Sequence, residues 1–94
     1  VGDGKFFIIT AKGDSMMGIG IDDGDLVIVR EQNTCRNGDY AVALVNGNET
    51  LLKTITYLPD KKAYLLHAEN PDYDDRIEHN VQIQGVATQV IKKL

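Results

Sequence analysis

The chain has 94 residues, of which 43% are hydrophobic, which is enough for one small domain with a compact core. The formal net charge of −4 and the scattered Lys and Arg residues argue against a surface that grips a nucleic-acid backbone. The single cysteine, Cys35, excludes an internal disulfide and favours a reducing, cytoplasmic location, and no apolar segment is long enough to span a membrane.

Short apolar segments separated by turn residues predict an all-β, or mostly β, domain of short twisted antiparallel strands. In chain order we expect strands at Phe6–Thr10, Leu26–Arg30, Tyr40–Val45, Thr50–Tyr57, Ala63–His67 and Val81–Ile91. Residues Ser15–Ile19 are expected to form one short helical turn. The segment Leu26–Arg30 is apolar on both faces, which indicates a strand in the interior of a sheet.

Turns are marked by glycine beside Asp or Asn, which tolerate a positive φ. They occur at Asp22–Asp25, Arg36–Gly38 and Asn46–Asn48, and Asn70-Pro71 marks a further turn. Asn46-Gly47 stands between two apolar segments and predicts a tight hairpin. In the last strand the apolar positions change parity at Gly85, which predicts a bulge or sharp bend there.

Lys53 lies on the more apolar face of its strand, together with Leu51, Ile55 and Tyr57. Burial disfavours the charged form of lysine, so its pKa should fall, and a neutral lysine can act as a general base. The alternative is that Lys53 snorkels at the sheet edge with its amino group in water.

Ser15 follows Gly13-Asp14 and precedes two methionines, at the end of the first strand. A serine in such a turn commonly forms hydrogen bonds to the backbone or caps a helix. A catalytic role requires a base within reach. Met16 and Met17 fit core or interface positions better than a chemical role.

The two features fall within one recognisable pattern. The run GDSMMGIGIDDGDLVIV (Gly13–Val29) resembles the nucleophile segment of the LexA/UmuD family of self-cleaving proteins, and Arg36–Val45 resembles the strand that follows it. Glu49-Thr-Leu-Leu-Lys53 stands where the family carries its lysine, and Glu69–Pro71 and Gln84–Ile91 also match. The likeness covers nearly the whole chain and is greatest to the LexA repressors of the SOS response.

The resemblance implies a compact LexA-like, signal-peptidase-like β-domain with Ser15 as nucleophile, Lys53 as base, and the backbone N–H groups of Asp14 and Ser15 as oxyanion donors. It also implies self-cleavage stimulated by RecA filaments on single-stranded DNA. Dimerisation is expected through the C-terminal strand, Val86–Ile91. Operator DNA would bind only through an N-terminal domain.

The family's cleavage site lies further upstream than the 14 residues before Ser15. We therefore expect residues 1–94 to be the catalytic and dimerisation domain alone. The family's lysine usually follows Thr-Val and precedes Arg, whereas here it stands in Leu-Leu-Lys53-Thr. Alternatives are a UmuD-like polymerase accessory protein, a phage repressor, and an interaction module with an inactive dyad.

No cofactor or metal is expected. The turn Asp22–Asp25 lacks the spacing of a calcium loop, and neither His67 nor His79 has a partner at zinc-ligand spacing. A Ser-His-Asp triad using either histidine is formally possible, but the sequence selects neither. Cys35 beside Arg36 fits a small, half-buried residue near a turn better than a reactive thiol.

Overall fold

The computed structural model describes residues 4–94 and contains one seven-stranded antiparallel sheet. The strands are β1 (Phe6–Thr10), β2 (Leu26–Glu31), β3 (Asp39–Val45), β4 (Glu49–Leu58), β5 (Ala63–His67), β6 (Arg76–Glu78) and β7 (Val81–Ile91). A 3-10 turn, η1 (Met17–Ile19), lies between β1 and β2. In the described part of the chain, no helix is long and apolar enough to cross a membrane. The expected all-β class is confirmed.

The six predicted strands are present, with bounds that differ by at most one residue. β6 is not among the predicted strands, because Arg76-Ile-Glu78 is too short and too polar to show an apolar alternation. It forms by pairing with β5, where Leu66 faces Arg76 and Tyr64 faces Glu78. The hairpin predicted at Asn46-Gly47 is present, and both residues have positive φ, 54° and 74°.

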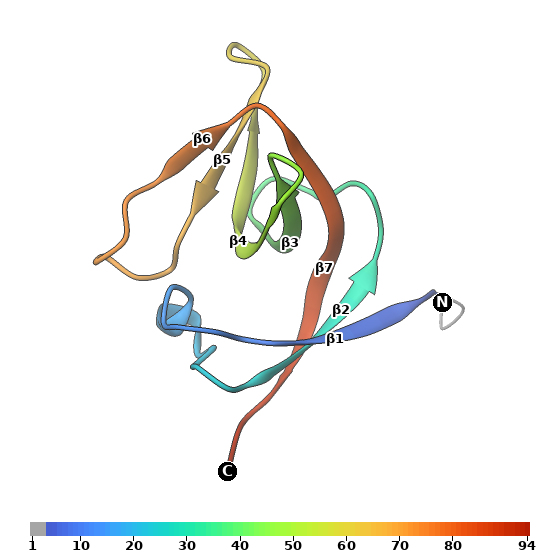
Figure 1. The fold of residues 1–94 in the computed structure, drawn as a ribbon, viewed down its shortest axis with the longest axis vertical. Helices are drawn as coiled ribbons and strands as arrows, with labels where there is room; N and C mark the ends of the chain where they lie inside the picture. The colour runs from blue at the N-terminus through green and yellow to red at the C-terminus, as the bar shows by residue number, and fades with distance from the viewer. Residues whose placement is uncertain (1–3) are drawn as a thin grey trace.

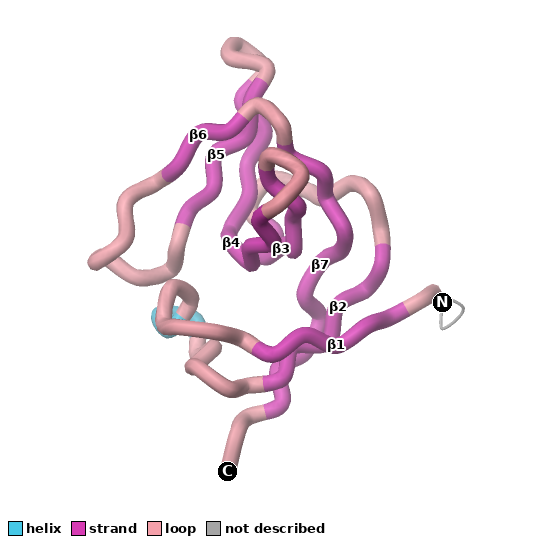
Figure 2. The backbone as a smooth tube through the Cα atoms, viewed as in Figure 1, coloured by secondary structure: helices cyan, strands magenta, loops and turns pink. Residues whose placement is uncertain are grey.

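The strand order is β1-β2-β7-β3-β4-β5-β6, so the last strand in the sequence lies in the middle of the sheet. β7 separates a β1–β2 half from a β3–β6 half and hydrogen-bonds to both (Figure 1). Figure 2 shows the one helical turn in the loop between β1 and β2, close to the loop that joins β5 to β6. The two halves therefore meet at loops that lie far apart in the sequence.

β7 is irregular beside Gly85, as predicted. β3 pairs Val42 with Gly85 and Ala43 with Ile83, which leaves Gln84 as the extra residue. Gly85 is buried, and an added Cβ would lie 2.5 Å from the backbone oxygen of Arg30 and from Cγ1 of Val29. The glycine thus lets β7 approach β2 more closely than any other residue would.

Two buried clusters form the core, and β3 contributes to both because its two faces are covered. The first contains Ala41, Ala43, Val45, Ile55, Leu66 and Ile83, and the second contains Met16, Ile21, Val27, Val29 and Val42. β2 is an interior strand as predicted, paired with β1 and β7. Only its Val27 and Val29 face is buried, since Leu26 is 37% exposed.

Candidate active site

Ser15 lies in a tight turn that connects β1 to η1. The Met17 N–H donates to the Asp14 carbonyl at 3.2 Å and closes the turn. The next side chain, Met16, is buried in the core and fixes the turn against the sheet, while Met17 is exposed. Gly13 has φ +77° and donates its N–H to Asp23 Oδ1 at 2.7 Å. The half-buried Ser15 hydroxyl is therefore presented by a well-held backbone.

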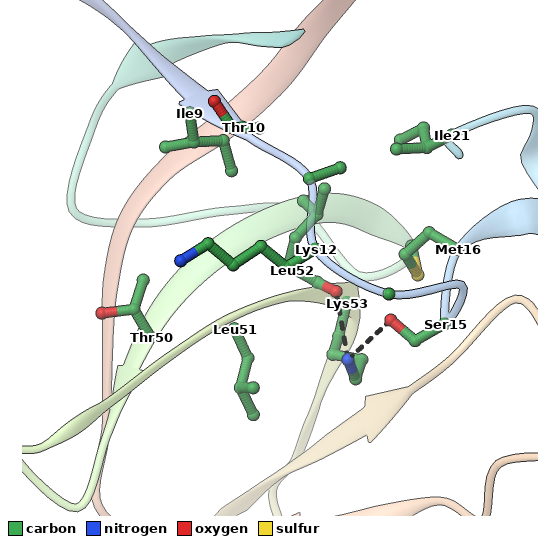
Figure 3. A pocket seen from close by; sticks show the side chains of 12 residues that line it. Ile9, Thr10, Lys12, Ser15, Met16, Ile21, Thr50, Leu51, Leu52 and Lys53 are labelled. Carbon is green, nitrogen blue, oxygen red and sulfur yellow. Dashed lines mark hydrogen bonds between the residues drawn. The ribbon is translucent and has the colours of Figure 1, made fainter. Parts of the chain in front are cut away.

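Lys53 lies near the middle of β4, opposite Ala41 of β3. Its side chain is half-buried, and its Nζ donates to Ser15 Oγ at 3.0 Å (Figure 3). A longer hydrogen bond of 3.4 Å runs from Nζ to the Leu52 carbonyl. The lysine therefore does not snorkel into water, and the two residues singled out from the sequence are in contact.

The surroundings of Lys53 favour its neutral form. Burial is the main reason why the pKa of the Lys53 ammonium lies below its usual range, and the positive charge of Arg76 adds to the effect. Glu49 opposes the shift. Arg76 is held by Glu49 through hydrogen bonds of 3.0 and 3.2 Å and by Glu78 at 3.0 Å. Lys53 therefore loses its proton more readily than an exposed lysine does.

A cavity of about 300 Å³ opens beside the Ser15–Lys53 pair. Its walls come from residues 9–13 at the end of β1 and residues 50–53 of β4, with Ser15, Met16 and Ile21 (Figure 3). Isoleucine, leucine and methionine side chains supply much of this lining. Such a lining suits small or apolar groups of a ligand.

The loop between β5 and β6 holds the serine turn from the other side. Asn70 Nδ2 donates to the Asp14 carbonyl at 2.9 Å, and Tyr73 OH donates to Asp14 Oδ1 at 2.7 Å. The Gly18 N–H donates to the Glu69 carbonyl at 2.7 Å. The sequence signals at Asn70-Pro71 indicated only a turn, because contacts between residues over fifty positions apart leave no local pattern.

Residues 1–88 match the Peptidase S24-like family. The chain belongs to this family. It is 42% identical over 86 residues to a LexA repressor of Ruegeria sp., with 87% of this chain and 34% of the relative covered. It is 41% identical over 86 residues to a LexA repressor of Cereibacter sphaeroides, with 89% of this chain and 37% of the relative covered. The resemblance to the LexA/UmuD family is thus confirmed, and the chain spans about a third of the length of these relatives.

The C-terminal residues of this S24-like chain are tied to the loop that follows η1. Lys92 Nζ contacts the Gly20 carbonyl, Asp22 and the buried carboxylate of Asp25. The hydrogen bond from Lys92, with those from the Lys93 and Asp22 N–H groups, lowers the pKa of Asp25 to about 2. The connection between the serine turn and β2 is therefore fixed by the end of the chain.

Within residues 4–94, neither histidine of the S24-like chain hydrogen-bonds to Ser15. His67 Nδ1 lies 2.6 Å from Asp75 Oδ1, and this hydrogen bond raises the pKa of His67. Ser15 Oγ hydrogen-bonds to Lys53, so a histidine triad has no geometric support. Burial raises the pKa of the Cys35 thiol, which does not favour a reactive thiolate. Within residues 4–94, no group of His, Cys, Asp and Glu side chains is arranged to hold a metal ion.

Proposed function

We propose that this chain is the self-cleavage and dimerisation domain of a LexA-type SOS repressor, with Ser15 as nucleophile and Lys53 as general base. The observation that carries the proposal is the 3.0 Å contact between Lys53 Nζ and Ser15 Oγ in a half-buried site. Family membership and the lowered pKa of Lys53 support it.

The proposed reaction is peptide-bond hydrolysis through an acyl-enzyme. Neutral Lys53 accepts the hydroxyl proton of Ser15 while Oγ attacks the peptide carbonyl. The backbone N–H groups of Asp14 and Ser15 stabilise the oxyanion that forms. The C–N bond then breaks as Lys53 returns the proton to the leaving amine. A water molecule, deprotonated by Lys53, hydrolyses the ester and restores the Ser15 hydroxyl.

The pH dependence of cleavage tests this proposal. Only neutral Lys53 is a base, so the rate should rise about tenfold per pH unit below its pKa and level off above it. Because that pKa is lowered, the midpoint should lie below the usual lysine value of about 10.4. The measurement is the rate at which the chain cleaves a synthetic peptide with two adjacent small residues after apolar ones, followed by mass spectrometry.

Ser15→Ala provides the blank for this profile. If the wild-type rate equals the Ser15→Ala rate at every pH, the proposed peptidase activity is wrong. A midpoint near pH 6.5 would instead point to a histidine base.

In the whole protein we propose that cleavage occurs in the same polypeptide, upstream of Ser15, and is stimulated by RecA filaments on single-stranded DNA in the cytoplasm. The relatives named LexA repressor are about three times as long as their matched part, which leaves room for a domain that binds operator DNA. Intramolecular attack gains a high effective concentration, so a simple dyad suffices. No membrane partner or cofactor is proposed.

We propose that the C-terminal half of β7 pairs with its copy in a dimer. β3 pairs with β7 only as far as Val86, so Ala87–Ile91 have a second edge that no described strand covers. Val90 and Ile91 in this half-paired part of β7 are exposed, as are Leu26 of β2 and Ile8 of β1. A free strand edge beside exposed apolar side chains favours pairing with another copy.

Ile91→Glu should weaken this dimer more than tenfold, because burial of an isoleucine contributes about 1.5–3 kcal/mol and 1.4 kcal/mol is a factor of ten. Sedimentation equilibrium over a range of protein concentrations measures the change. Ile77→Glu is the matched control, because Ile77 is exposed to a similar extent, 47% against 48%, but lies on β6 at the far edge of the sheet. Equal effects of the two substitutions would contradict the β7 interface.

A further inference from the structure

Asn70 is a buried polar residue that takes no part in the Ser15–Lys53 contact. Its Nδ2 donates to the Asp14 carbonyl at 2.9 Å, and its Oδ1 accepts from the Asp72 N–H at 2.9 Å. Only 5% of Asn70 is exposed, so these hydrogen bonds are shielded from water. Burial of an amide is costly unless its polar groups are paired, and the two bonds therefore fix the orientation of the side chain.

The Asp14 carbonyl and the Ser15 N–H belong to the same peptide unit. No cis peptide bond occurs in residues 4–94, so the N–H points away from the carbonyl across a planar unit. The carbonyl is held by Asn70 Nδ2 and by the Met17 N–H. The Ser15 N–H is thus turned away from the β5–β6 loop. In the described part of the chain, this N–H donates no hydrogen bond.

The cavity beside the dyad is built by the end of β1 and by β4, without the β5–β6 loop. Its lining includes Ser15 but no residue of the range 68–75. A backbone N–H that has no partner, belongs to the nucleophile and points away from the β5–β6 loop suits an oxyanion donor. The donor is useful only while its peptide keeps this orientation.

We propose that Asn70 is a positioning residue that orients the Asp14–Ser15 peptide so that the Ser15 N–H faces the carbonyl oxygen of the substrate. The inference rests on the proposed peptidase function. Tyr73 also contacts Asp14, but through the side-chain carboxylate, and the tyrosine is exposed. Asn70 alone among the side chains of the β5–β6 loop holds the carbonyl that fixes the direction of the Ser15 N–H.

Asn70→Asp tests the role of the amide donor. The variant keeps an acceptor for the Asp72 N–H but offers the Asp14 carbonyl a carboxylate oxygen in place of Nδ2, so assays are run at alkaline pH where no proton remains to donate. We expect kcat for peptide cleavage to fall about a hundredfold or more, as when one oxyanion donor is lost. KM should stay within about threefold, because the cavity is unchanged. The added carboxylate favours protonated Lys53, as Glu49 does, so kcat is compared on the alkaline plateau of each pH profile.

Tyr73→Phe is the matched control, since it removes one hydrogen bond to Asp14 without touching the carbonyl. We expect its kcat, KM and pH midpoint to match the wild type. An unchanged kcat in Asn70→Asp would overturn the proposal. So would a fall in kcat accompanied by a large rise in KM, which would indicate that the whole turn is displaced. A wild-type chain without activity would instead reject the proposed function itself.

Because the buried aspartate of Asn70→Asp can prevent folding, a second measurement uses the wild-type chain. A fluorophosphonate forms a bond between phosphorus and Ser15 Oγ, fluoride leaves, and Lys53 takes the hydroxyl proton. The phosphonyl oxygen then stands in for the oxyanion. In the NMR spectrum of the wild-type adduct we expect the Ser15 amide proton to move downfield further than any other. An adduct in which this proton does not move would overturn the inference, and failure to form an adduct would reject the dyad.

Discussion

Lys53→Met should lower the rate of peptide cleavage by about a hundred- to ten-thousand-fold, which is the usual contribution of a general base. Methionine has a side chain of similar length but no proton acceptor of comparable strength, so the Ser15 hydroxyl keeps its proton. The substitution removes an ammonium from a half-buried position and should leave the fold intact or slightly more stable. Mass spectrometry of the peptide products and thermal unfolding measure the two effects separately.

Two further variants are controls for Lys53→Met. Ser15→Ala should be inactive at every pH, and it should not react with a fluorophosphonate. Lys61→Met removes a lysine from the exposed turn after β4 and should cleave peptide at the wild-type rate. If Lys53→Met cleaves as fast as Lys61→Met, the base is another group and the proposed dyad is wrong.

Gly85→Ala should destabilise the domain by at least about 1–3 kcal/mol, the range for adding a methyl group to a tightly packed core. The added Cβ would lie 2.5 Å from the Arg30 backbone oxygen, which cannot turn aside as a flexible side chain can. β7 would have to move away from β2, at the place where the two halves of the sheet are joined. Denaturant unfolding gives the free energy of unfolding directly.

Gly4→Ala is the control for this substitution. Its added Cβ would meet the Arg30 guanidinium, with Cζ at 3.1 Å, and this exposed side chain can move. We expect a change of less than about 0.5 kcal/mol, as for most surface substitutions. If both alanine variants have the wild-type free energy of unfolding, β7 does not need the close approach at Gly85.

The strands could be predicted because each has a local signature. Val27 and Val29, or the Asn46-Gly47 turn, carry their information in one short stretch of sequence. The strand order could not be predicted in this way, because β7 reaches the middle of the sheet only through pairing with strands from both ends of the chain. β6 could not be predicted from local sequence either, since its position depends on pairing with β5 and on the contacts of Arg76.

The candidate site likewise has features that the local sequence predicts and features that only the structure reveals. Lys53 attracted notice because a lysine interrupts an apolar strand face, and Ser15 because of the family pattern around it. Their contact joins residues 38 positions apart, and no periodicity foretells it. The role inferred for Asn70 depends on a hydrogen bond across 56 positions and on the direction of one peptide unit. Such information exists only in three dimensions.

The central place of β7 also bears on synthesis of the protein at the ribosome. Ser15 belongs to the β1–β2 half and Lys53 to the β3–β6 half, and the strand that joins these halves is translated after the other six strands. Lys92, which secures the loop after η1, follows even later. A nascent chain therefore lacks the assembled Ser15–Lys53 pair until β7 has left the exit tunnel. The proposed self-cleavage could then begin only after β7 has been made and paired.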